Sequence, residues 1–475
     1  MHPLALKRFY SWSIFLLFVG FYLAYSEIYW SALGIPILFF GAALFLFSFD
    51  KIMLFIAFCT PLSLKVMFGN SGINLPDEPL MFILLMLFII KSFENGMDKD
   101  FYKHPLTFAV IFNLFWILVT TLTSTMPFIS FKFFLARLWC TVFGFFWGAL
   151  LFKDFKKIKQ FLFAFGLGLS ILVFYSTIRH AKTGFTDDKV WAMMNPFMDD
   201  HTVYGAVCSI VATFGFVLAF YKRKTLYFYE RIIAFYIGIC ALTGVVLSYS
   251  RAAWLSVIFA LLFYLVLKLK ISFRNLAIGL AVVVGIALIF NDEIYQNIRL
   301  NKASSGKSLQ GDIKSISNVK TDESNVERLN RWESGWRMFQ AKPLLGFGPG
   351  TYMFKYSPYQ RAHEMTSISS TQGTMGGIHS EYFGPAVESG IVGLISLILL
   401  FGTFISINMK TYYQTKNQEI KMLSLAILLG LMTYFFHGLM NNFIDQDKAA
   451  VIFWLMMGMT VALSIRQKKE LTKTA

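Results

Sequence analysis

Three short stretches of the sequence carry residue types that bind phosphate groups or move protons. Arg251 lies in "SYSRAAWL", Arg328 and Arg331 lie in "VERLNRWESGW", and His379 lies in "GGIHSEYFG". A guanidinium group presents a planar fork of donors that matches the oxygens of a phosphate. An imidazole has an unperturbed pKa of about 6.5, so it can accept a proton from a hydroxyl near neutral pH. These residue types predict a site that holds a phosphate and accepts a proton.

Each of these residues also has a plainer interpretation. Arg251 could reach lipid headgroups and help to set the depth of two membrane spans. Arg328 could lie on the solvated flank of an amphipathic helix. His379 could be held by backbone groups at the membrane interface. The residues by themselves leave both interpretations open.

A fourth stretch, "NPFMDDHTVYG", holds Asp199, Asp200 and His201. Paired aspartates can bind a divalent cation, but one adjacent pair without further acidic ligands is a weak signal. The alternative is a helix N-cap, in which a carboxylate accepts backbone N–H groups at the positive end of the helix dipole. We assign no metal ligand here, and we expect His201 to be a substrate-binding residue.

Arg137, preceded by Lys132, is a charge at the start of an apolar stretch. A charge in a membrane-spanning segment is costly unless it faces a partner or a water-filled cavity. We therefore expect both residues to belong to a substrate site or pathway, with a partner for Arg137 that the sequence does not reveal.

Composition defines the elements that must position these groups. The chain has 475 residues, of which 56% are hydrophobic and 15% are charged. A soluble protein of this composition would expose too much apolar surface. The apolar stretches run on for about 17 to 23 residues, enough for a helix to cross a bilayer, and they do not alternate as barrel strands do. We therefore predict an all-α, polytopic transmembrane helical bundle.

We predict about twelve to fourteen spans from the lengths of these stretches. The third candidate contains Pro61 and is short enough to be re-entrant, and the eleventh is marginal in length. The candidates are centred near residues 20, 41, 58, 84, 116, 142, 168, 211, 241, 260, 282, 397, 432 and 457.

Basic residues alternate between the predicted loops in the way that sets membrane orientation. This pattern places both termini in the cytoplasm. The net charge of +16 follows mainly from this bias and from contact with anionic headgroups, so nucleic-acid binding is a poor interpretation of it. The basic loops lie near residues 7–8, 91–103, 153–159, 222–231, 268–274, 410–421 and 466–473.

The chain divides into three parts: residues 1–290 with N-terminal spans, a large outer loop at 291–384, and residues 385–475 with the last spans and a cytoplasmic tail. A loop of this length usually carries function or disorder. Within it, Leu329, Trp332, Trp336 and Phe339 recur at spacings of three and four, so they predict an amphipathic helix at the membrane interface. Pro343 ends this helix.

Three motifs, in order, resemble those of the O-antigen ligase and polymerase superfamily of polytopic bacterial membrane proteins. The resemblance covers roughly residues 130–460. The motifs are "SYSRAAW", the segment from Arg328 to Trp332 with the following "KPLLGFGPGTY", and His379-Ser380 followed by Gly390 and Gly393.

The resemblance implies a membrane glycosyltransferase with a GT-C-like architecture in the bacterial inner membrane. Such proteins move a glycan from undecaprenyl pyrophosphate to an acceptor hydroxyl on the periplasmic side, and for ligases this acceptor is a sugar of lipid A-core. The family is regarded as inverting and metal-independent, so no cofactor is expected. The expected partners are the lipid-linked glycan donor, the acceptor and membrane lipids.

The resemblance also assigns tasks to the residues named above. Arg251 and Arg328 are expected to hold the pyrophosphate, and His379 to act as the base. We expect Glu388 to orient His379 or to pair with an arginine. The full set of expected substrate-binding residues is Arg331, Arg137, Lys132, Ser380, Glu388 and His201.

Two further functions compete with ligation. A polymerase of the same superfamily, or a relative that glycosylates protein Ser or Thr, would share the arginines and differ in its acceptor. A transporter of lipid-linked sugars is the alternative from another class, and it predicts charges along a path at mid-membrane. The ionisable residues instead cluster at the outer edge, which favours transfer over transport. The match at His379-Ser380 with the downstream glycines favours ligation over the related transfers.

Overall fold

The fold is that of a computed structural model of the full chain. The structure describes residues 49–68, 71–95, 99–186, 189–222, 225–271, 323–362, 365, 369 and 376–474. The chain divides into two compact units, Met1–Ala57 and Phe58–Ala475, and the site discussed below belongs entirely to the second.

Within the described residues, nine helices are long and apolar enough to cross a membrane. This finding confirms the prediction of an all-α, polytopic bundle. They are α6 (Pro105–Leu122), α7 (Pro127–Thr141) continued through the π-helical η2 (Val142–Trp147) into α8 (Gly148–Leu151), α9 (Phe155–Lys182), α11 (His201–Phe220), α12 (Phe228–Leu247), α13 (Arg251–Lys268), α19 (Phe383–Gln414), α20 (Gln418–His437) and α21 (Asp447–Thr474).

The remaining predicted spans have different outcomes. The segment near residue 84 forms the helix α4 (Asp77–Asn95), which is not among the nine candidate spans. The spans predicted near residues 20, 41 and 282 lie outside the described residues. The span predicted near residue 58 is wrong as a single crossing. There α3 (Phe49–Cys59) ends before Pro61, and the chain turns through η1 (Thr60–Leu62) into an antiparallel hairpin of β1 (Leu64–Phe68) and β2 (Ser71–Leu75). Proline lacks the N–H that a continuing helix needs.

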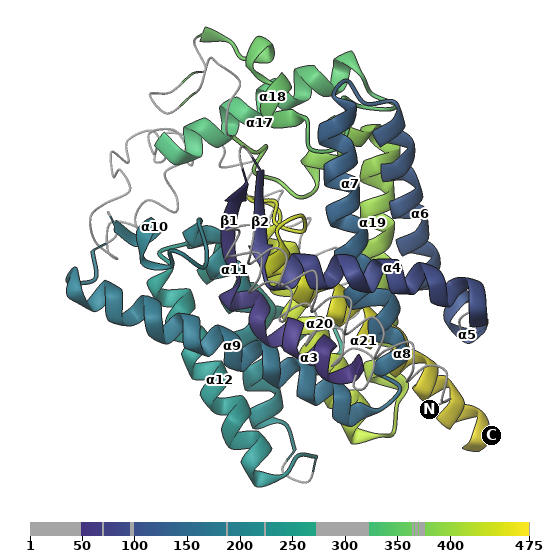
Figure 1. Cartoon of the computed structure of the whole chain (residues 1–475). Helices are drawn as coiled ribbons and strands as arrows, with labels where there is room; N and C mark the ends of the chain where they lie inside the picture. The colour runs from purple at the N-terminus through teal and green to yellow at the C-terminus, as the bar shows by residue number, and fades with distance from the viewer. Residues whose placement is uncertain are drawn as a thin grey trace, which may run out of the picture. The chain divides into compact units, whose positions relative to one another are not determined.

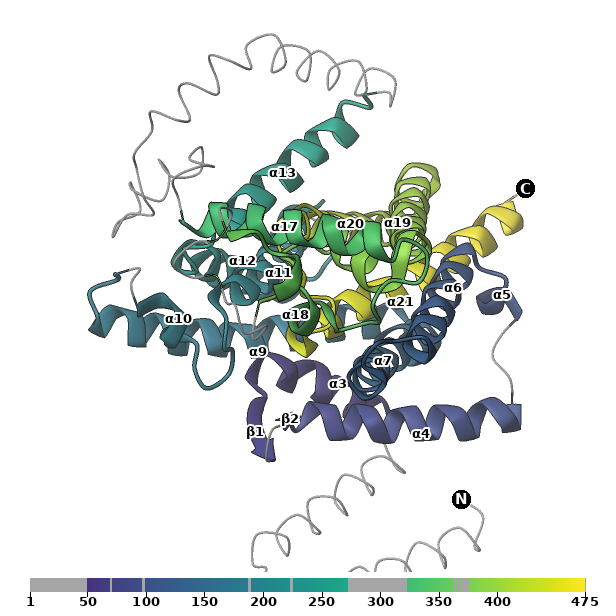
Figure 2. The same ribbon diagram turned by 90° about the horizontal axis from the view of Figure 1, so that it is seen from above.

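The centre of the second unit is formed by α11, α20 and α21 (Figures 1 and 2). The spans of α20 and α21 are each 89% buried within the protein, whereas that of α13 is 28% buried. Buried polar contacts hold α6 against α19: Asn113 Nδ2 donates to Ser396 Oγ at 2.9 Å, and Trp116 Nε1 donates to the Ser389 carbonyl at 2.8 Å. Such hydrogen bonds between helices supplement close packing where lipid supplies no hydrophobic drive.

The predicted amphipathic helix is present as α17 (Glu323–Ala341), and it ends before Pro343 as expected. It lies across one end of the bundle together with the short α18 (Tyr352–Lys355) (Figures 1 and 2). Its apolar residues divide between two environments. Trp332 and Phe339 pack against a buried apolar cluster drawn from residues 338–387, whereas Trp336 is 49% exposed.

The segment after α17 is joined to the first turns of α19 by backbone hydrogen bonds. Phe347 N donates to the Val387 carbonyl at 3.2 Å, and Ile391 N donates to the Pro343 carbonyl at 2.8 Å. This contact bends α19 at Gly390, whose φ is 70°. A Cβ at Gly390 would lie 2.0 Å from the Leu344 carbonyl oxygen, so only glycine allows the two segments to meet.

Candidate active site

Arg251 is the first residue of α13 and follows a tight turn from α12. Ser250 caps the helix by accepting from Ala253 N at 3.4 Å, and Tyr249 takes a left-handed φ of 51° to complete the turn. A cation at a helix N-terminus meets the positive end of the helix dipole, which is unfavourable by a few tenths to about 1 kcal/mol. An anion bound at this point would interact favourably with both the dipole and the guanidinium group.

A cavity of about 140 Å³ opens beside this turn. Arg251 lies on one wall, and Arg328 reaches the same cavity from α17. Two guanidinium groups from separate motifs therefore line one small polar space. Its other lining residues are His201, Thr202, Tyr249, Ser250, Ala252, Leu255, Met440 and Asn441.

His201 reaches the cavity from the first turn of α11. Its Nδ1 lies 2.8 Å from the Ser248 carbonyl oxygen. A carbonyl can only accept, so the ring proton sits on Nδ1 and Nε2 keeps its lone pair. The preceding Asp200 is the helix N-cap, which accepts from Thr202 N at 2.7 Å. Asp199 forms an exposed ion pair with Lys65 at 3.1 Å.

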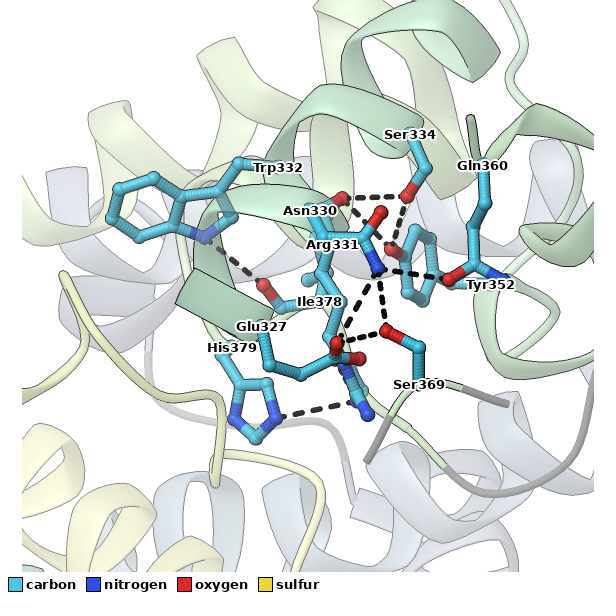
Figure 3. A network of polar contacts seen from close by, with 11 residues as sticks. Glu327, Asn330, Arg331, Trp332, Ser334, Tyr352, Gln360, Ser369, Ile378 and His379 are labelled. Carbon is cyan, nitrogen blue, oxygen red and sulfur yellow. Dashed lines mark hydrogen bonds and ion pairs between the residues drawn. The ribbon is translucent and has the colours of Figure 1, made fainter. Parts of the chain in front are cut away.

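His379 lies beside Arg331 in a network of buried polar groups (Figure 3). Arg331 Nη1 lies 3.3 Å from His379 Nε2 and donates to the Gly377 carbonyl at 2.9 Å. A guanidinium group has no acceptor, so Nε2 of His379 must accept and the ring proton sits on Nδ1. The ring also forms a hydrogen bond with the Asn441 side chain. Burial, followed by the charges of Arg331 and Arg328, lowers the pKa of His379 to about 4.

Arg331 is held in place by a buried carboxylate. Glu327 Oε1 accepts from Arg331 Nε at 2.8 Å, and only 3% of Glu327 is exposed (Figure 3). The other oxygen of Glu327 accepts from Asn330 Nδ2 at 3.3 Å. The loop before His379 passes close above this network: a Cβ at Gly376 would lie 1.8 Å from Arg331 Nη1. A glycine is needed here because the backbone covers a guanidinium group.

Arg137 lies at a second, smaller cavity of about 40 Å³, and the structure supplies the partner that the sequence left open. Its Nε donates to Asp445 Oδ1 at 2.7 Å. The same cavity is lined by Glu381, whose carboxylate accepts from Tyr434 OH at 2.6 Å and from Phe443 N at 2.9 Å. The buried Arg137 is therefore paired with the partly exposed Asp445, away from the cavity that Arg251 and Arg328 line.

None of the three remaining predicted residues lines the larger cavity, although Glu388 and Ser380 line the smaller one beside Arg137. The Glu388 carboxylate accepts from the backbone amides of Gly350 and Tyr352, each at 2.9 Å, so it fixes the glycine-rich loop to α19. Ser380 Oγ accepts from Phe383 N at 3.2 Å, at the start of α19. Lys132 is exposed on α7.

Sequence reasoning missed the loop between α20 and α21. Its Asn441 is 3% exposed, touches His379 and lines the larger cavity. Two interactions fix the loop: the Glu381 carboxylate accepts a hydrogen bond from Phe443 N of the loop, and Asp445 of the loop pairs with Arg137. The available signal was the run "MNNFIDQD", an unusual density of amide and acidic side chains in the short connection between α20 and α21.

Two comparisons with known proteins bear on this site. The profile of the O-antigen ligase family matches residues 235–398, a region that contains Arg251, Arg328 and His379. A protein of Haemophilus influenzae, described as an uncharacterized protein, is 23% identical over 316 residues, which are 65% of this chain and 74% of that protein. The match at residues 235–398 is consistent with the O-antigen ligase-like superfamily that the three motifs predicted.

Proposed function

We propose that this membrane protein moves a glycan from undecaprenyl pyrophosphate to an acceptor hydroxyl, with ligation of O-antigen to lipid A-core as its principal reaction. The match to the O-antigen ligase family supports a glycosyltransferase of the ligase or polymerase type. The observation that carries the proposal is that Arg251 and Arg328 line one cavity, although they come from different helices and different motifs.

The proposed reaction is a single displacement at the anomeric carbon. The acceptor oxygen forms a bond to this carbon while its bond to the pyrophosphate oxygen breaks, so the configuration inverts. The electron pair of the broken bond stays on the pyrophosphate, which is a good leaving group and needs no strong general acid. Its growing charge is stabilised by the two guanidinium groups, which act best in a site with little water. No step calls for a metal ion, because the arginines supply the positive charge.

The hydroxyl proton requires an acceptor, and a neutral imidazole is suited to this task at neutral pH. The motif assigns the task to His379, which lies within the electrostatic influence of Arg328. His201, also expected at the substrate site, is a second imidazole with its proton on Nδ1. Either residue is compatible with the proposed overall reaction.

We further propose that the cavity faces the periplasm and that both chain termini are cytoplasmic. The alternation of basic loops supports this orientation. It is consistent with a donor that carries its glycan on the outer leaflet of a bacterial inner membrane. The two arginines would then lie at the depth where lipid phosphate meets water.

The test is reconstitution with a defined donor. Purified protein in nanodiscs is incubated with an undecaprenyl-pyrophosphate glycan and, separately, with lipid A-core, with a second lipid-linked repeat unit, and with a Ser/Thr-containing peptide. Mass spectrometry identifies the product. Ligation predicts product with lipid A-core, and product with one of the other acceptors alone would assign polymerisation or protein glycosylation instead.

Arginine variants complete this experiment. Arg251→Ala and Arg328→Ala should abolish product, while Arg361→Ala, which changes an exposed arginine of the same outer segment, should leave it unchanged. No product with any acceptor, together with movement of the lipid-linked glycan across the nanodisc or a liposome membrane, would refute the transferase and favour a transporter.

A further inference from the structure

The turn that carries Arg251 is joined to the short segment that follows α9, residues 183–186. Tyr249, two residues before Arg251, donates its hydroxyl hydrogen to the Phe185 carbonyl at 2.6 Å. The tyrosine is 9% exposed and lines the cavity that Arg251 and Arg328 share. A side chain in the cavity wall therefore connects the arginine turn to a segment that is distant in the sequence.

Both residues of this hydrogen bond have a strained backbone. The φ of Phe185 is 57° and that of Tyr249 is 51°. Residues with large side chains rarely occupy this left-handed region, and they stay there only where surrounding contacts hold them. Because such strain is typical of functional sites, the contact between these two residues is a candidate for setting the shape of the site.

A buried histidine supports both strained residues. The centroid of the His180 ring lies 5.4 Å from that of the Phe185 ring and 5.6 Å from that of the Tyr249 ring. His180 Nε2 forms a hydrogen bond with the Thr186 carbonyl at 2.8 Å, and Phe185 N donates to the His180 carbonyl at 3.1 Å. The segment is thus fixed to the end of α9, so its carbonyl is a firm partner for Tyr249.

We propose that Tyr249 is a positioning residue for the lipid diphosphate, and that its hydrogen bond to Phe185 holds the Arg251 turn in the shape that binds the donor. This inference rests on the proposed transferase function. Arg251 is the first residue of α13, so the direction of its guanidinium group depends on the fold of the turn before it. The hydroxyl hydrogen of Tyr249 is already donated to the Phe185 carbonyl, and a diphosphate can only accept. The tyrosine therefore acts through the turn.

The first test removes the hydroxyl and keeps the ring. We expect Tyr249→Phe to raise the Kd for undecaprenyl pyrophosphate about tenfold, the typical cost of one lost hydrogen bond. The Kd for undecaprenol, which lacks the diphosphate, and the KM for the acceptor should not change. Tyr413→Phe is the matched control, because Tyr413 donates to the Leu267 carbonyl at 3.0 Å at the other end of α13. This control should keep the wild-type preference for the diphosphate.

A second pair of variants tests the backbone of Phe185. Phe185→Asn keeps the carbonyl and a side chain that tolerates the left-handed region, whereas the branched side chain in Phe185→Val does not tolerate it. We expect Phe185→Val to weaken diphosphate binding as much as Tyr249→Phe does, and Phe185→Asn to stay within about threefold of wild type. Thermal unfolding is measured alongside, because a purely structural role would lower stability and leave the preference for the diphosphate unchanged.

The possible outcomes separate this proposal from the proposed function. The proposal is overturned if Tyr249→Phe keeps the wild-type preference for the diphosphate, or if Tyr413→Phe loses it to the same extent. It is also overturned if Phe185→Asn and Phe185→Val bind the donor equally. A wild-type protein that binds the two lipids equally and makes no product with any acceptor would instead refute the transferase function, so the two failures are distinguishable.

Discussion

The protein holds two polar cavities that each contain arginine, and their charge balance differs. At the smaller cavity Arg137 is accompanied by Glu381, Glu388 and Asp445. At the larger cavity Arg251 and Arg328 are accompanied by hydroxyl, amide and imidazole groups, and no carboxylate is among the described lining residues. A buried arginine with a carboxylate partner is a structural element. We propose that the larger cavity receives a phosphate, because two guanidinium groups on its walls can donate to the same anion.

The largest loss of stability should come from a substitution at the smaller cavity, which Arg137 lines. Arg137→Met leaves Asp445, whose side chain is 29% exposed, without its ion-pair partner, and the loss of a hydrogen bond to a charged group costs about 1.5–3 kcal/mol. Thermal unfolding of the detergent-solubilised protein measures this loss. Replacing both residues, as in Arg137→Met with Asp445→Leu, should recover much of it. If the single variant instead kept its stability and lost donor affinity, the two cavities would not differ as described.

A substitution at the larger cavity should instead lower activity and leave stability nearly unchanged. Arg251→Ala should lower kcat by about 10²–10³, the typical cost of losing one donor to a developing charge. Its thermal stability should stay close to that of wild type, because the residue begins a helix of which only 28% is buried. Activity is followed as product formed per folded molecule. A large drop in stability with normal turnover would show that Arg251 stabilises the fold and does not bind the substrate.

A substitution in the loop over Arg331 should lower activity by less than the loss of Arg251 does. In Gly376→Ala the new methyl would meet Arg331 Nη1 at 1.8 Å, so the guanidinium group must move away from His379. Misplacement of this size at a site costs about 10- to 10²-fold in rate. Gly402→Ala in α19 is the matched control, because nothing lies within 4 Å of its added Cβ. Equal activity of the two variants would show that the network around Arg331 does not support the site.

Much of this comparison was accessible from the sequence, because it depends on local patterns. Continuous apolar runs predicted the spans, spacings of three and four predicted α17, and the three motifs located Arg251, Arg328 and His379. Pairings between distant segments were not accessible. Nothing near Arg137 indicates Asp445, and Glu388 appeared to be a partner for His379 or an arginine although its carboxylate accepts from backbone amides.

The hairpin that replaces the span near residue 58 was also not accessible from the hydropathy pattern. Hydropathy reports that a segment is apolar, but it does not report that the chain turns at Pro61 and pairs with itself. Likewise, the loop of Asn441 has no periodicity of its own. Its position is set by Glu381 and by Arg137, which lie far away in sequence.

The smallest expected effect concerns pH. The pKa of His379 in the folded protein, about 4, lies below its unfolded value near 6.5, so the unfolded chain binds more protons between these values. The stabilisation from neutral His379 is complete above about pH 6.5 and declines as the pH falls toward 4. Wild type should therefore lose about 1–2 kcal/mol more than His379→Gln between pH 7 and pH 5. Glu381 works against this trend, since burial raises its pKa to about 7, and the comparison with His379→Gln removes its contribution.

The central claim is that Arg251 and Arg328 bind the same lipid diphosphate in a single cavity. The most direct measurement compares the affinity for undecaprenyl pyrophosphate with that for undecaprenol, which lacks the diphosphate, in wild type, Arg251→Met, Arg328→Met and the double variant. The account predicts that each single change removes most of the preference for the diphosphate and that the double change adds little. If both single variants, or the double variant, kept the wild-type preference, the diphosphate would bind elsewhere and the account would be contradicted.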